Sequence, residues 1–193
     1  LPERERKRFL YGEFVKVEGS IYDKFDLETM SVDVADIPPF EYYTVGIDNT
    51  GTNFGAVLIG WAGDKIYVLG EKTAFRETMQ NFDADIQYSW RQYNYVAYCD
   101  PAAAQLNQLV WNGTNADNAV SPGIDYLKSK MESGSFFIVK KNGNVLCPQL
   151  LAEMDLYRYD EKGRIIKEAD HLCDSLRYGT CSHAKYGASI IKQ

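Results

Sequence analysis

The chain has 193 residues, of which 45% are hydrophobic and 25% are charged, and this is enough for one domain with a sizeable core. No apolar stretch approaches the length of a membrane span, and the start, LPERERKRFL, is charged where a signal peptide would be apolar, so we expect a soluble intracellular protein. The formal net charge of −6 argues against a module that binds nucleic acid through overall positive charge alone. The four cysteines lack C-x-x-C spacing, which favours reduced thiols over a zinc site.

The first predicted segment, residues 1–38, is irregular and runs into the two prolines of DIPPFE. Three β-rich segments follow: YYTVGID (42–48), FGAVLIGW (54–61) and KIYVLGE (65–71). The short links between them contain glycine, so we expect an antiparallel meander of three strands.

Helices and buried strands alternate along the rest of the chain. Helical patterns lie at 77–94, 101–111, 121–134, 147–159 and 168–179, and strand patterns lie at 95–100 and 135–141. Residues 157–167, YRYDEKGRIIK, alternate around a glycine and predict a hairpin. A meander followed by strands reached through helical crossovers implies an α/β fold, in which a mixed sheet has helices on both faces. This order of elements resembles the ribonuclease H-like fold.

Two aspartates are the last residues of predicted strands. Asp48 closes the first strand of the meander, and Asp100 closes the strand at 95–100. In open α/β sheets, functional sites form outside the carboxyl ends of strands, next to the point where the connections diverge. The alternative is that Asp48 begins a turn and that Asp100 only caps the helix after it.

The stretch EADHLCDSLRYG (168–179) contains one of the two histidines in the chain. Helical periodicity gathers its apolar residues on one side, namely Ala169, Leu172, Cys173 and Leu176. His171, Asp174 and Tyr178 lie on the opposite side, three or four residues apart. This polar side is either a solvated surface or the border of a cleft that also receives Asp48 and Asp100. In the second case, three carboxylates and an imidazole would suit two divalent cations such as Mg²⁺ or Mn²⁺.

Six segments in order resemble a known family. They are RERKRFLYGEFVKVEGSIYDKF, YYTVGIDNTGTNFGAVLIGW, YVAYCDPAAAQL, NAVSPGIDYLKSKMESGSFFIV, LLAEMDLYRYDEKG and EADHLCDSLRYG. Together they span nearly the whole chain, and they are similar to the C-terminal nuclease domain of tailed-bacteriophage terminase large subunits. The resemblance implies a metal-dependent endonuclease that cleaves concatemeric double-stranded DNA during genome packaging.

The resemblance also implies the residues that carry this activity. Asp48, Asp100 and Asp174 would be the catalytic metal ligands for two Mg²⁺ or Mn²⁺ ions, and Asp48 would bridge them. His171 would be a ligand, a proton acceptor or a group that orients Asp174. Residues 1–38 would connect an ATPase domain to a nuclease domain at 39–193, and no G-x-x-x-x-G-K-[ST] motif occurs in the chain. The implied partners are DNA, the small terminase subunit and the portal, in the cytoplasm of the host cell.

Basic residues of the predicted hairpin are candidates for contact with the DNA backbone. These residues are Arg158, Lys162, Arg164 and Lys167, with Lys140 and Lys141 as the next candidates. A solvated hairpin, in which they only balance nearby acids, is the alternative. Two other functions compete with a terminase nuclease: a non-catalytic module that docks onto DNA or the portal, and a resolvase-like or transposase-like nuclease of the same fold.

Overall fold

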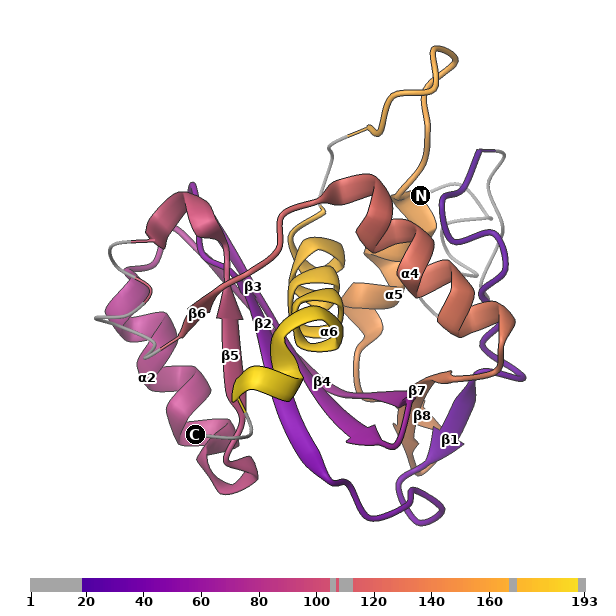
Figure 1. Cartoon of the computed structure of the whole chain (residues 1–193), viewed down its shortest axis with the longest axis horizontal. Coiled ribbons are helices and arrows are strands. Elements are labelled where there is room, and N and C mark those ends of the chain that lie inside the picture. The colour runs from indigo at the N-terminus through magenta and orange to yellow at the C-terminus, as the bar shows by residue number, and fades with distance from the viewer. Residues whose placement is uncertain (1–18, 105–106, 108–112, 167–169, 191–193) are drawn as a thin grey trace.

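The computed structural model describes residues 19–104, 107, 113–166 and 170–190 (Figure 1). In this part of the chain, eight strands form one sheet. The order across the sheet is β1 (Ser31–Asp33), β7 (Phe136–Lys141), β4 (Lys65–Phe75), β3 (Asn53–Ala62), β2 (Tyr42–Asp48), β5 (Val96–Cys99) and β6 (Thr114–Asn115), with β8 (Asn144–Val145) paired to β7.

The predicted meander is confirmed, because β2 and β3, and then β3 and β4, pair in antiparallel fashion. The strands that follow the meander join both of its edges in parallel fashion: β5 beside β2, and β7 beside β4. The sheet is therefore mixed, as the sequence predicts. Because β2 and β5 are parallel neighbours, Asp48 and Asp100 lie side by side at the carboxyl ends of these two strands.

Helices cover both faces of the sheet (Figure 1). On one face, α2 (Met79–Trp90) packs Phe82, Ile86 and Trp90 against β2, β3 and β5. On the other face lie α4 (Val120–Glu132), α5 (Pro148–Leu156) and α6 (His171–Ile190). Strand β3 is buried on both faces, which is why its sequence reads as a continuous apolar run.

The segment before the meander belongs to the same core. Ile21, Tyr22 and Phe25 are buried, and β1 pairs in parallel with β7. Irregular patterning alone did not indicate this strand. None of the described helices combines the length and apolarity needed to cross a membrane.

The predicted hairpin after α5 is present in the described residues. Tyr159 and Ile165 form an antiparallel bridge, and Gly163 turns with a φ of 73°. Figure 1 shows this segment projecting from the body of the molecule before the chain enters α6. Of the predicted helix at 101–111, the structure describes a 3₁₀ turn, η2 (Pro101–Ala103), followed by helical Ala104 and Asn107.

Candidate active site

Glycines allow α6 to lie directly against β2 and β3. A Cβ at Gly46 would overlap the carbonyl oxygen of Ser175, and a Cβ at Gly179 would lie 2.8 Å from the backbone nitrogen of Gly46. A Cβ at Gly55 would lie 2.8 Å from the carbonyl oxygen of His171. Helix backbone and strand backbone are therefore in contact, and this contact holds the first turns of α6 over the end of β2.

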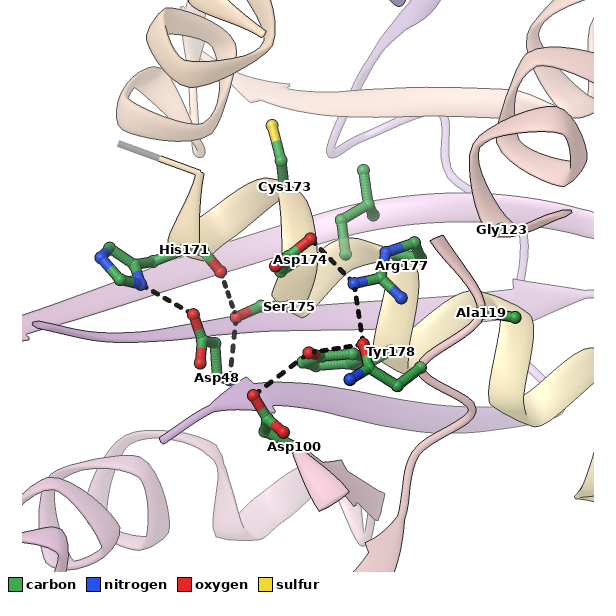
Figure 2. Close-up of polar contacts among 12 residues, drawn as sticks. Asp48, Asp100, Ala119, Gly123, His171, Cys173, Asp174, Ser175, Arg177 and Tyr178 are labelled. Atoms are coloured by element: carbon green, nitrogen blue, oxygen red, sulfur yellow. Dashed lines mark hydrogen bonds and ion pairs between the residues drawn. The ribbon is translucent and has the colours of Figure 1, made fainter. Parts of the chain in front are cut away.

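Asp48 is held on both sides where β2 ends (Figure 2). Its backbone N–H donates to the Ser175 hydroxyl at 3.1 Å, and that hydroxyl donates to the His171 carbonyl oxygen at 2.7 Å. Its Oδ2 lies 2.7 Å from His171 Nδ1, and its Oδ1 accepts from the Thr50 hydroxyl at 3.2 Å. Because Asp48 is only 5% exposed, these contacts fix the direction of its carboxylate.

The pKa of His171 is raised above its ordinary value. The hydrogen bond to Asp48 is the largest cause, and it outweighs the opposing effect of burial. The negative charges of Asp48, Asp170 and Glu153 raise the pKa further. A proton on Nδ1 is therefore stabilised between the imidazole and the Asp48 carboxylate.

Asp100 lies beside Asp48 and is 7% exposed. As its position predicts, it caps the following turn, because Oδ1 accepts from the backbone N–H of Ala102 at 2.8 Å. Its Oδ2 accepts from the hydroxyls of Tyr178, at 3.2 Å, and Thr50, at 3.3 Å. The cap role and the site role are thus compatible, because the two carboxylate oxygens serve different partners.

The Thr50 hydroxyl connects the two carboxylates. It lies 3.2 Å from an oxygen of Asp48 and 3.3 Å from an oxygen of Asp100. A hydroxyl has one proton, so it can donate to only one of these oxygens at a time. Two carboxylates in a largely buried space therefore compete for the Thr50 proton. This excess of oxygen ligands and negative charge suits a hard divalent cation.

Asp174 faces the same region from α6 but is paired with an arginine (Figure 2). Arg177 Nη2 donates to Asp174 Oδ1 at 2.9 Å and lies 3.4 Å from Asn118 Oδ1. The Arg177 side chain is 2% exposed and stacks on the Tyr178 ring, with its guanidinium carbon 4.7 Å from the ring centroid. The Asp174–Arg177 pair, in which only Arg177 is fully buried, and Tyr178 thus form the part of the site nearest α4.

Arg177 is incompletely satisfied. Its Nε and Nη1 are buried and have no hydrogen-bond partner within the described residues. Gly123 of α4 leaves the space for this side chain, because a Cβ there would lie 2.6 Å from Arg177 Cδ. A buried guanidinium with unused donors is costly, so its position depends on the acidic group that it neutralises.

The structure brings Asp48, Asp100 and His171 into one network, and it directs Asp174 to Arg177. Of the described residues, no three His, Cys, Asp or Glu side chains converge on one metal position. Asp48 and Asp100 fit a divalent cation by their chemistry and proximity, whereas Asp174 is engaged with Arg177. Tyr178, expected on the polar face of its helix, is 2% exposed because that face packs against Asp100 and Asn118.

Glu153 was not indicated by the sequence patterns. It lies on α5, and its Oε2 accepts from the backbone N–H groups of Leu172, at 2.7 Å, and Cys173, at 3.1 Å. It therefore caps the N-terminus of α6 from another helix. Burial raises the pKa of Glu153 to about 7, although these hydrogen bonds lower it. In the sequence, Glu153 is marked only by its position next to Met154, an apolar residue of the same helix that is buried in the structure.

The basic residues proposed to contact DNA occupy two places. On the hairpin, Lys162 is exposed, Arg158 is half-buried, and Arg164 forms an ion pair with Asp160 at 2.8 Å. Lys167 lies outside the described residues. Lys140 and Lys141 end β7, which β4 and β3 separate from β2. The Arg164 pair agrees with the alternative in which hairpin cations balance nearby acids.

No family model and no curated protein matches the chain, but several solved structures do. A large terminase from a thermophilic bacteriophage is similar, with a TM-score of 0.72 and 22% identity over 95% of this chain and 52% of that protein. The P22 large terminase nuclease domain has a TM-score of 0.70 and 20% identity over 88% of this chain and 94% of that domain. The chain has the fold of a large-terminase nuclease domain.

A third similar structure is the large terminase nuclease from the thermophilic phage G20c with bound magnesium. Its TM-score is 0.60, with 15% identity over 86% of this chain and 98% of that one. The chain spans about half the length of the first of these three proteins and nearly all of the two isolated nuclease domains. The mixed, helix-flanked sheet predicted from the sequence is thereby confirmed as a terminase nuclease fold.

Proposed function

We propose that this chain is the nuclease domain of a phage large terminase and cleaves double-stranded DNA during genome packaging. One observation carries the proposal. In the fold of a terminase nuclease, Asp48 and Asp100 end neighbouring parallel strands and are close enough to share the Thr50 hydroxyl. The G20c nuclease of the same fold was solved with magnesium, which supports a divalent cation here.

Asp48 and Asp100 would hold the cations, and Asp174 would join them by exchanging Arg177 for the metal. Two bound Mg²⁺ or Mn²⁺ ions would supply an activated water and stabilise the leaving 3′ oxygen. The residues of the chain itself prepare this site. His171 and Thr50 orient the Asp48 carboxylate, Tyr178 orients that of Asp100, and Arg177 neutralises Asp174, which would otherwise be available to hold a cation.

The surroundings of this domain are also part of the proposal. We propose that residues 1–38 lead from an ATPase domain and that residues 39–193 form the nuclease domain. In the described residues, 19–33 pack on the nuclease core. The small terminase subunit and the portal would be partners in the host cytoplasm. The basic side chains of the hairpin would contact the DNA backbone.

Plasmid cleavage with Mg²⁺ or Mn²⁺ tests the proposed activity. Wild-type protein is expected to cut, and Asp48→Asn, Asp100→Asn and Asp174→Asn are expected to be inactive while remaining folded. Asp125→Asn is the matched control, because Asp125 is an exposed acid on α4. An intact plasmid with wild-type protein would instead indicate a docking module. Preference for branched DNA over linear duplex would indicate a resolvase-like nuclease.

Metal binding is tested separately by thermal melting. A cation that binds only the folded protein raises its melting temperature. The rise is expected in wild type and in Asp125→Asn, and it should be largely lost in Asp48→Asn and Asp100→Asn. An equal rise in all four proteins would place the metal elsewhere.

A further inference from the structure

The carboxyl end of β4 lies on the same side of the molecule as the carboxyl ends of β2 and β5, where Asp48 and Asp100 are. Asp48 pairs with Gly55, and Gly55 pairs with Thr73, so these residues form one row across β2, β3 and β4. Phe75 lies two residues beyond this row and pairs with Asn53. With strands about 4.8 Å apart and a rise of about 3.3 Å per residue, Phe75 and Arg76 are roughly 12–14 Å from Asp48. This is about four base-pair steps along the axis of a duplex, at about 3.4 Å per step.

Phe75 is on the α6 face of the sheet. Successive strand residues point to opposite faces, and Thr73 bonds to Gln149 of α5 at 3.1 Å. Lys72 points the other way, where it pairs with Asp85 of α2 at 2.8 Å. Phe75 therefore shares the face on which His171 begins α6. It is 66% exposed, so a large aromatic side chain is in water beside the site.

Arg76 stacks on this ring and keeps its charge available. Its guanidinium carbon is 4.8 Å from the Phe75 ring centroid. Within the described part of the chain, no carboxylate forms an ion pair with Arg76. The adjacent acid, Glu77, is turned to the start of α2, where it accepts from the Thr78 N–H and the Asn81 amide, each at 2.8 Å.

The backbone at Arg76 is in an uncommon conformation. Its φ is 54°, in the left-handed region that residues other than glycine seldom adopt. Its N–H donates to the carbonyl oxygen of Thr52 at 2.7 Å, and Thr52 is in the turn that follows Asp48. Such conformations persist where the surrounding structure holds them, and they cluster at functional sites. The turn that carries Thr50 therefore also positions Phe75 and Arg76.

We propose that Phe75 and Arg76, here called the β4 tip, form a DNA-contact element, in which Arg76 binds a backbone phosphate and Phe75 packs against the adjoining sugar and base. The inference rests on the proposed nuclease function. It accounts for how a chain of net charge −6 presents a cation and an exposed aromatic ring to DNA beside its acidic site. A phosphate contact contributes salt-dependent affinity, and aromatic packing contributes affinity that is independent of salt.

The test is the affinity of the chain for a short labelled duplex, measured by fluorescence anisotropy over a series of salt concentrations without divalent cation, so that the DNA stays intact. Arg76→Ala should weaken binding about 3–10-fold and reduce the slope of log affinity against log salt by about 0.9. Arg76→Lys should keep the wild-type slope. Phe75→Ala should weaken binding about 5-fold or more with an unchanged slope.

Matched controls lie at the other end of α2. Tyr88, which is 80% exposed, and Arg91, which is also exposed, supply an aromatic ring and a guanidinium away from Asp48 and Asp100. Tyr88→Ala and Arg91→Ala should bind as wild type does. Thermal melting checks that every variant is folded.

Three outcomes overturn the inference. The first is wild-type binding by either Phe75→Ala or Arg76→Ala. The second is a loss of affinity in Tyr88→Ala and Arg91→Ala that equals the loss in the β4-tip variants. If wild-type protein binds no duplex, the inference fails, and the proposed nuclease function fails with it only if the plasmid also stays intact with Mg²⁺ or Mn²⁺. If wild-type protein binds and cuts DNA while the β4-tip variants bind equally well, only the inference fails.

Discussion

Replacing Gly46 by alanine should damage both the stability and the site, because a Cβ at this position meets only backbone. It would overlap the Ser175 carbonyl oxygen and lie 2.5 Å from the backbone nitrogen of Gly179. No side chain can rotate away, so α6 must move off β2. Overpacking of this kind costs about 3 kcal/mol. For a domain of this size, that corresponds to a melting temperature lower by about 6–12 °C.

The same displacement should weaken metal binding. Ser175 and His171 contact Asp48 from α6, so moving the helix removes the partners that orient the carboxylate. The rise in melting temperature produced by Mg²⁺ should therefore be smaller in Gly46→Ala than in wild type.

Gly70→Ala is the matched control on β4, which β3 separates from β2. A Cβ there would lie 3.4 Å from the Trp90 ring, which is an ordinary contact. This variant should melt within a few degrees of wild type and keep the full Mg²⁺ effect. The reasoning is refuted if Gly46→Ala melts like Gly70→Ala, because the helix–sheet contact would then not set the position of α6.

Three further predictions concern titratable and charged groups. In metal-free protein, protonated His171 stabilises the fold, because its pKa is raised above the unfolded value of about 6.5. This stabilisation is fully present below about pH 6.5 and is lost as the pH rises through the folded pKa. In urea unfolding, the free energies of His171→Gln and wild type should therefore differ more at about pH 5.5 than at about pH 8.5. Arg177→Met should lower the free energy of unfolding by about 3 kcal/mol, because it removes one partner of the ion pair with Asp174. Mg²⁺ should raise the melting temperature of this variant more than that of wild type, because no guanidinium then competes for Asp174. An equal rise would show that the ion pair does not oppose metal binding. Burial lowers the pKa of His183 to about 4, so the unfolded chain binds the extra proton and wild-type stability should fall by up to about 3 kcal/mol between about pH 6.5 and 4, with a shallower pH dependence in His183→Phe.

Local patterns in the sequence determined most of the elements and the positions of two acids. The continuous apolar run of β3 marks a strand buried on both faces, and the four-residue spacing of Phe82, Ile86 and Trp90 marks the buried side of α2. Asp48 and Asp100 were found because each ends an apolar strand before a turn. These features depend on neighbours within a few residues, so they can be predicted without knowing the tertiary fold.

Only the tertiary structure decided how the site is arranged. Glu153 caps α6 from α5, Gly123 of α4 makes room for Arg177, and Gly46 receives α6 against β2. The direction of Asp174 toward Arg177 also follows from burial of the face that periodicity marked as polar. The contacts with Glu153, Gly123 and Gly46 join positions far apart in the chain, and their geometry depends on how closely helix and sheet pack. No local periodicity encodes that distance, because it is set by the backbone atoms and glycines that meet across the core.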